Sequence, residues 1–175
     1  MKFTETKLKG AYVIELEPIE DERGFFARSF CQKEFEKYGL NPRIVQCNIS
    51  HNNKKGTVRG MHYHITPYAE TKIVSCIRGK IYDVIIDLRK HSPTYRQWYA
   101  VELSWNNGKI LYVPEGFAHG FQTLEDNTVV YYQMSEFYHP ESARGVRWDD
   151  PVFVINWPSD NTILSEQDRN YSLFG

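Results

Sequence analysis

The chain lacks any long hydrophobic run, and this excludes several classes of protein. No stretch of its 175 residues approaches the roughly 18 apolar residues that a helix needs to cross a bilayer. The first ten residues, MKFTETKLKG, have no apolar run behind their lysines, so no secretory signal is expected. Repeats, low-complexity tracts and linkers are also absent, which predicts one domain over residues 1–175. We therefore expect a cytoplasmic protein without a membrane partner.

An excess of charge of one sign is missing as well. Lys and Arg total 21 against 22 Asp and Glu, for a net charge of −1. A general nucleic-acid-binding protein would carry a clustered basic excess, so no nucleic-acid partner is expected. The three cysteines form no CxxC pair, which argues against a disulfide framework or a cysteine zinc site. No Walker or GxGxxG loop occurs, so neither ATP nor a nicotinamide cofactor is implied.

What the chain does contain is strand-forming sequence. Hydrophobic residues make up 41% and aromatic residues 15%, enough for a real core. One short helix is predicted, at Gln32–Lys37. Short segments rich in Val, Ile and Tyr, separated by turn residues, predict strands at Ala11–Leu16, Lys72–Ile77, Lys80–Leu88, Trp98–Leu103, Lys109–Val113 and Thr128–Met134. This close spacing predicts an all-β sandwich, jelly roll or barrel with antiparallel hairpins.

Two histidine-containing stretches stand out. The first, GTVRGMHYH, ends in His62 and His64 and is followed by Glu70. The second, GKILYVPEGFAH, ends at His119. Alternation along a strand would place His62 and His64 on one face. The spacings resemble the two cupin motifs, with a slightly long gap before Glu70, and so imply a small jelly roll in which such residues often bind a divalent metal. Each histidine is alternatively a structural hydrogen-bonding group at a strand end.

A longer series of segments is more specific than the cupin motifs. These segments lie between Tyr12 and Asp168 and occur in the order Asp21–Phe26, Gln46–Ser50, Arg59–Tyr63, Lys72–Val74, Asp83–Arg89, Ser92–Thr94, Pro114–Phe121, Tyr132, Tyr138–Pro140, Arg144–Gly145, Trp148–Pro151, Trp157–Pro158 and Leu164–Asp168. Nearly the whole chain therefore resembles the dTDP-4-dehydrorhamnose 3,5-epimerase family. The segments RGMH and PEGFAHGF carry the resemblance most strongly.

The resemblance implies a cupin-type β jelly roll with a few short helices and an isomerase activity. The substrate would be a nucleotide-linked 4-keto-6-deoxy sugar. Its C3 and C5 protons both flank the C4 ketone, so they are acidic enough to be removed if the enolate is stabilised. This chemistry is redox-neutral, and no cofactor is expected. The resemblance also implies a homodimer that exchanges N-terminal strands.

The same resemblance assigns the catalytic residues. His62 would be the base, and its ordinary pKa near 6.5 suits proton abstraction at neutral pH. Asp168 would orient that imidazole, Lys72 would lie at the developing oxyanion, and Tyr132 would return a proton from the opposite face. His119 would bind a sugar hydroxyl or the carbonyl oxygen.

Each assignment has a structural alternative that the sequence leaves open. Lys72 opens a strand and could be solvated, and Asp168 could be a turn or N-cap residue. Tyr131 and Tyr132 are adjacent, so one faces inward and the other outward. The resemblance favours Tyr132 as the inward residue.

Substrate binding is assigned by resemblance as well. Arg23 and Arg59 would bind the diphosphate, because the guanidinium fork suits phosphate oxygens. Gln46 and Asn48 would contact substrate through their amides, and Tyr138 would lie near the nucleotide and sugar. Arg23 is alternatively an ordinary hairpin-turn residue, since Asp-Glu-Arg-Gly is common turn chemistry.

Several positions depart from the family pattern. Arg28 and Ala143 stand where the family usually has glutamate, and Gln133 and Gln167 where it commonly has lysine. His64 replaces a glutamine. Because the acid–base residues are retained, these changes predict an altered choice of nucleotide or sugar, and Arg28 is included as a substrate-binding candidate.

Rival functions follow from the same residues. A metal-dependent cupin enzyme would use His62, His64, Glu70 and His119, although the main prediction is a metal-free site. The residues would also suit a single-site epimerase of a CDP- or GDP-linked sugar, a 3,4-ketoisomerase, or a binding protein without catalysis.

Overall fold

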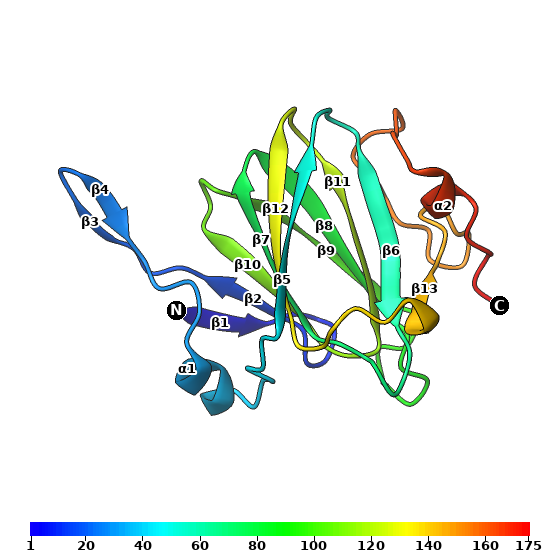
Figure 1. Cartoon of the computed structure of the whole chain (residues 1–175), viewed down its shortest axis with the longest axis horizontal. Helices are drawn as coiled ribbons and strands as arrows, with labels where there is room; N and C mark the ends of the chain where they lie inside the picture. The colour runs from blue at the N-terminus through cyan, green and yellow to red at the C-terminus, as the bar shows by residue number, and fades with distance from the viewer.

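The computed structural model describes residues 1–175 and consists mainly of two antiparallel sheets that face each other (Figure 1). The six-stranded sheet has the order β1 (Lys2–Glu5), β2 (Tyr12–Glu15), β10 (Lys109–Val113), β7 (Lys72–Arg78), β12 (Thr128–Met134) and β5 (Gln46–Asn52). The five-stranded sheet has the order β13 (Ala143–Gly145), β6 (Val58–His64), β11 (Phe117–Thr123), β8 (Lys80–Asp87) and β9 (Trp98–Ser104). This architecture confirms the all-β prediction.

The remaining elements are small. A separate hairpin, β3 (Ile19–Asp21) and β4 (Gly24–Phe26), projects from the body beside β2 (Figure 1). Helix α1 (Gln32–Lys37) coincides with the predicted helix, and the second helix, α2 (Glu166–Arg169), has a single turn. A 3₁₀ turn at Pro140–Ser142 precedes β13. Neither α-helix has the length and apolar character needed to span a bilayer.

Composition predicts the apolar strands well and misses the polar ones. The predicted segments at 109–113 and 128–134 are strands with the same bounds, and the other four differ by one residue at one or both ends. Strand β5, QCNISHN, has few β-branched residues, and β11, FAHGFQT, contains a glycine. Their strand state is set by hydrogen bonding to β12 and to β8, which local propensity does not register.

The main core lies between the two sheets. It is a cluster of twelve buried residues, contributed by both sheets and the β1–β2 turn: Leu8, Ala11, Val74, Cys76, Ile81, Ile85, Leu103, Leu111, Val113, Phe117, Phe121 and Val130. Two smaller clusters cover the outer faces. One packs Phe35 of α1 against the six-stranded sheet, and the other packs Phe153 against Met61, Val84 and Ile86 of the five-stranded sheet. The core fills only part of the space between the sheets.

The end of β8 is fixed by a buried carboxylate. The side chain of Asp87 has no exposed surface and accepts hydrogen bonds from Arg89, Ser92 and Thr94. Burial alone would raise the pKa of Asp87, but these donors outweigh it and lower the pKa to about 2. Arg89 also donates to the carbonyl of Lys9, so the network joins β8 to the β1–β2 turn.

We expect Asp87→Asn to lower the free energy of unfolding by about 2 kcal/mol at pH 7, which is the stability that a pKa lowered by about two units contributes. Because the folded-state pKa lies below the unfolded-state pKa near 3.9, this stabilisation is present above about pH 4 and is lost as the pH falls toward about 2. The difference between wild type and variant should therefore shrink over that range in urea unfolding.

The matched control is Asp149→Asn. Asp149 forms a bidentate pair with Arg147 at the surface, so its replacement should cost less than about 1 kcal/mol. Equal costs for the two substitutions would contradict the role of burial.

Candidate active site

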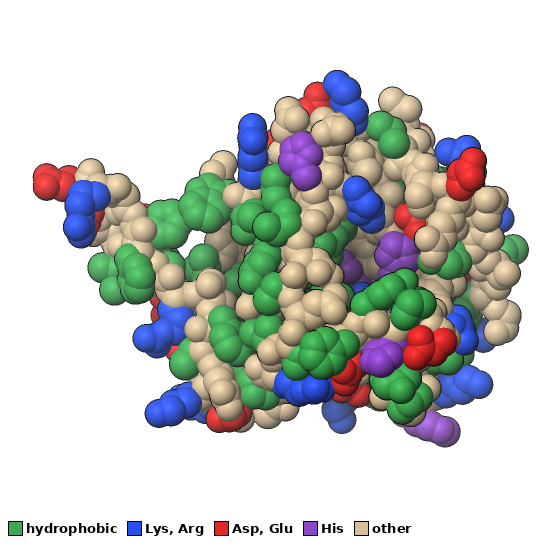
Figure 2. Space-filling view, viewed as in Figure 1, with side chains coloured by type: hydrophobic (Ala, Val, Ile, Leu, Met, Phe, Trp, Pro, Cys, Tyr) green, Lys and Arg blue, Asp and Glu red, His purple; other side chains and the backbone are tan.

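A cavity of about 260 Å³ opens between the two sheets. Figure 2 shows the hollow in this face of the molecule, with histidine side chains inside it. Its wall is formed by β5, β6, β7, β11 and β12, through Asn48, Ile49, Ser50, Arg59, His62, Lys72, His119, Phe121, Tyr132 and Met134. Six of these residues are candidates from the sequence: Asn48, Arg59, His62, Lys72, His119 and Tyr132. The fold therefore gathers most of the candidates into one cavity.

An irregularity in β6 brings Arg59 and His62 to the same face. His119 pairs with His62, whereas Phe121 pairs with Arg59, so β6 has one more residue than β11 over this stretch. In a regular strand, residues three apart point to opposite faces; the extra residue reverses this. Gly60 carries the irregularity with φ of +120°, a conformation that residues with a side chain rarely adopt.

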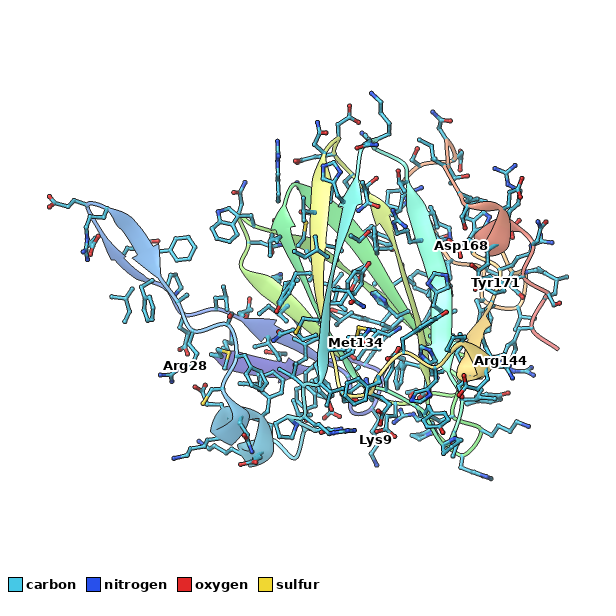
Figure 3. All side chains as sticks on the ribbon, viewed as in Figure 1. Lys9, Arg28, Met134, Arg144, Asp168 and Tyr171 are labelled. Atoms are coloured by element: carbon cyan, nitrogen blue, oxygen red, sulfur yellow. The ribbon has the colours of Figure 1, made fainter.

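His62 is held by a carboxylate from the C-terminal segment. Its Nε2 lies 2.6 Å from Oδ1 of Asp168, and the backbone N–H of Gly60 donates to Oδ2 of the same residue at 3.4 Å. Ser165 caps α2 by accepting from the N–H of Asp168, which fixes the helix beside β6 (Figure 3). Burial alone would raise the pKa of Asp168, but the hydrogen bonds from His62 and Gly60 lower it. The ionised carboxylate accepts from Nε2–H, which leaves Nδ1 as the basic nitrogen.

His119 has its own carboxylate. Its Nε2 lies 2.7 Å from Oδ1 of Asp83, and both side chains are almost completely buried. Burial raises the pKa of Asp83, while His119 and Lys72 act in the opposite direction. No role for Asp83 is predicted from the sequence. A signal exists, because Asp83 lies between apolar residues in the strand KIYDVIID.

Tyr132 and Tyr131 point to opposite faces of β12. Tyr132 lines the cavity and packs near His119 and Phe121, whereas Tyr131 lines a groove on the outer face of the sheet. Burial, followed by the charge of Asp83, raises the pKa of Tyr132. The phenol is therefore protonated at neutral pH and available as a proton donor.

Lys72 lies at the start of β7 and contacts a second histidine–carboxylate pair. Its Nζ lies 3.1 Å from Oε1 of Glu70, and Nδ1 of His64 lies 2.8 Å from the same oxygen. His64 lies two residues beyond His62 on the same face of β6, as alternation predicts. The side chains of Glu70 and His64 are buried and lie behind Lys72, outside the lining of the cavity.

Each of the three histidines is paired with a different carboxylate. His62 pairs with Asp168, His64 with Glu70 and His119 with Asp83. No group of three or more His, Cys, Asp or Glu side chains is arranged to hold a metal ion. This geometry does not fit the rival ligand set, which needs His62, His64, Glu70 and His119 around one point.

Other candidates lie at the rim. Arg59 donates from Nε to Oδ1 of Asn52 at 2.7 Å, which directs the guanidinium along β5. Gln46 accepts from the backbone N–H of Tyr138 at 3.2 Å and so ties the loop after β12 to β5. The ring of Tyr138 is exposed and lies 5.8 Å from the ring of His64.

Arg23 and Arg28 do not reach the cavity of their own chain. Arg23 lies on the β3–β4 hairpin with 85% of its side chain exposed and pairs with Asp21. Arg28 follows the hairpin and pairs with Glu34 of α1 at 3.0 Å. Figure 3 shows Arg28 on the opposite side of the molecule from Asp168. Within one chain, neither arginine is positioned to contact a ligand beside His62.

The remaining departures from the family pattern are also peripheral. Gln133 lines the outer groove with Tyr131, and Ala143 pairs with His64 across β13 and β6. Gln167 donates to the hydroxyl of Tyr171 at 2.9 Å. The ring of Tyr171 lies 5.9 Å from that of His62, a contact that the sequence analysis misses because nothing local indicates where the C-terminal segment lies.

Comparison with known proteins identifies the family. A sequence model of the dTDP-4-dehydrorhamnose 3,5-epimerase family matches residues 5–175. The chain belongs to this family. The epimerase of that name from Methanothermobacter thermautotrophicus is 45% identical over 173 residues, which cover 97% of this chain and 92% of the relative.

Two solved structures of family members are also similar. The enzyme from Bacillus anthracis, crystallised with TDP and PPi bound, has a TM-score of 0.96 and 43% identity over 99% of both chains. An epimerase from Legionella pneumophila, in complex with dTDP-4-keto-L-rhamnose, has a TM-score of 0.93 and 37% identity over 98% of this chain and 92% of that one. These similarities support the cupin-type jelly roll that the sequence predicts.

We expect Gly60→Ala to lower the free energy of unfolding by about 2–4 kcal/mol, because it combines backbone strain with overpacking. A Cβ at this position would lie 2.6 Å from Cα of Gly120 and 2.7 Å from the carbonyl oxygen of His119. Gly24→Ala is the matched control. Gly24 has a similar φ of +126°, but a Cβ there would have nothing within 4 Å. Its replacement therefore measures the cost of backbone strain without overpacking.

Thermal unfolding of both variants measures the difference. If Gly60→Ala costs no more than Gly24→Ala, the close approach of β6 and β11 is not what requires glycine.

Proposed function

We propose that this chain is a 3,5-epimerase of a dTDP-linked 4-keto-6-deoxy sugar. The observation that carries the proposal is that His62 and Tyr132 face one cavity from opposite sheets. A base and an acid on opposite sides of a sugar ring are what inversion of a carbon centre requires. Family membership supplies the substrate class, since the relatives are named for this reaction.

His62 is the base. Asp168 holds Nε2–H, so Nδ1 removes the proton at C3 or C5, and the imidazolium that forms is stabilised by the adjacent carboxylate. The lowered pKa of Asp168 keeps this carboxylate ionised at neutral pH. Because the His62 side chain is 42% exposed, its proton exchanges with water between turnovers.

Lys72 stabilises the enolate. As the proton leaves, the electron pair of the C–H bond moves toward C4 and charge develops on the ketone oxygen. An ammonium group placed beside the ketone oxygen stabilises that charge, on the order of 10²–10³ in rate for one such donor. His119 lines the same cavity from the opposite sheet, and because its Nε2–H donates to Asp83, its Nδ1 accepts a hydrogen bond from a sugar hydroxyl.

Tyr132 donates a proton to the opposite face of the enolate carbon. The new C–H bond forms as the phenolic O–H bond breaks, and the phenolate recovers its proton from solvent. Arg59, at the cavity mouth beside Asn48 and Asn52, binds the diphosphate through its guanidinium fork. Gln46 and Tyr138 at the rim contact the nucleoside.

The test is proton NMR of dTDP-4-keto-6-deoxyglucose with the protein in D₂O. Wild type should exchange both the C3 and the C5 protons. Exchange of one alone would indicate a single-site epimerase, and exchange of neither would overturn dTDP-hexose as the substrate. CDP- and GDP-linked ketosugars serve as comparison substrates.

Two variants test the assigned faces. His62→Ala should lower the exchange rate by about 10²–10⁴, the contribution expected of a general base. Tyr132→Phe should still exchange deuterium on the His62 side but form little inverted product. Inversion at the wild-type rate in Tyr132→Phe would remove Tyr132 from the proposed mechanism.

We propose further that two chains form a homodimer in which the β3–β4 hairpin of each chain reaches the cavity of the other. The hairpin exposes Ile19 and Phe26 by 72% and 75%, although isolated hairpins are unstable without a covering surface. A groove of about 340 Å³ on the outer face of the six-stranded sheet, lined in part by Phe25, Trp105 and Tyr131, gives a second copy an apolar surface. This arrangement would bring Arg23 to the diphosphate.

Mixed dimers test this arrangement. Arg23→Ala should raise KM about 10- to 100-fold, the loss expected for one charged hydrogen bond. His62→Ala should be nearly inactive. A dimer with one chain of each kind, purified through two different tags, would contain one complete cavity and recover about half of the wild-type activity.

If Arg23 served the cavity of its own chain, neither cavity would be complete and the mixed dimer would remain impaired. Sedimentation of the wild type as a monomer would overturn the dimer itself.

A further inference from the structure

Glu70 is buried in an unusual way for a carboxylate. Its side chain is 3% exposed, and one oxygen, Oε1, receives both of its contacts: Nδ1 of His64 at 2.8 Å and Nζ of Lys72 at 3.1 Å. The other oxygen, Oε2, is buried without a hydrogen-bond partner. Lys72 is therefore the only lysine or arginine paired with Glu70.

His64 completes this arrangement. Its Nδ1–H donates to Glu70, and its Nε2 is buried with no partner. Nδ1–H is therefore the one hydrogen bond that this imidazole makes within the chain, and Glu70 receives it. The geometry joins His64, Glu70 and Lys72 in a chain that ends at the ammonium group.

We propose that Glu70 and His64 are a positioning pair for Lys72. This inference rests on the proposed epimerase function. Glu70 anchors the ammonium at the start of β7, where Lys72 lines the cavity with His62, His119 and Tyr132. His64 in turn fixes the rotamer of Glu70. Neither residue lines the cavity, so the pair acts through Lys72 and not by touching the sugar.

The main variant is Glu70→Gln, which keeps the size of the side chain and removes its charge. We expect kcat to fall about 10- to 100-fold, because a misplaced donor loses much of its effect on the transition state. KM should change less than about threefold, since ground-state binding depends mainly on contacts elsewhere. A purely structural role would instead lower the amount of folded enzyme and leave kcat per active site unchanged.

His64 provides a conservative pair of variants. His64→Gln keeps an N–H donor that can reach Glu70 and should retain kcat within about threefold. His64→Leu removes the donor and should lower kcat more than His64→Gln does. The matched control is Glu102→Gln, because Glu102 forms a similar pair with Lys80 at 3.3 Å on the outer surface, away from the cavity.

A double-mutant cycle distinguishes action through Lys72 from a direct role. In a Lys72→Met background, Glu70→Gln should cause no further loss of kcat. Losses that multiply in the double variant would show that Glu70 acts independently of Lys72 and would overturn the proposal.

A readout without substrate keeps this test separate from the proposed function. The rate at which an acetylating reagent modifies Lys72 is measured by peptide mass spectrometry, with Lys33 as the internal reference. Release of the ammonium in Glu70→Gln should speed modification several-fold, whereas Glu102→Gln should leave it unchanged. An unchanged rate in Glu70→Gln would overturn the proposal. If the wild type exchanged neither the C3 nor the C5 proton, the epimerase function would be refuted. Faster modification of Lys72 in Glu70→Gln would then still support the positioning of Lys72 by Glu70.

Discussion

The close approach of β6 and β11 is the constraint on which the site depends. Gly60 and Gly120 let the two backbones come so near that a Cβ on either would lie within 2.7 Å of the other strand. The extra residue that Gly60 accommodates turns Arg59 and His62 to the same face. The proposed base, His62, and the proposed phosphate-binding residue, Arg59, therefore line one cavity because glycines at positions 60 and 120 allow this approach.

Pairing of histidines with carboxylates lowers the free-energy cost of burying polar groups around this cavity. Three histidines face it or border it, and each has its own carboxylate from a different part of the chain: the C-terminal helix, the loop before β7, and β8. Burying an unpaired carboxylate would be strongly unfavourable. Of the three imidazoles, only that of His62 is substantially exposed, and this difference in access favours His62 as the reacting group in the proposed mechanism.

Local sequence predicts the apolar strands and α1 because alternation and β-branched residues act within a few neighbours. Local sequence does not predict strands β5 and β11, because their polar or glycine-containing sequences form strands only by pairing with β12 and β8. The family and the expected reaction are inferred from the resemblance in the segments around His62 and His119. Asp83 begins one of the segments that carry the resemblance but is given no role there, and Tyr171 lies beyond the last of them, although both contact the site.

The sequence by itself determined the all-β fold class through short-range periodicity and the family through the resemblance of its motifs, and the same resemblance names the acid–base candidates. Only the tertiary structure decided that Tyr132 faces inward, that Glu70 holds Lys72, and that Arg23 and Arg28 lie away from the cavity of their own chain. Such choices depend on which strands pair and on where a buried charge finds its partner. Both depend on packing between residues far apart in the chain, which cannot be predicted from a few sequence neighbours.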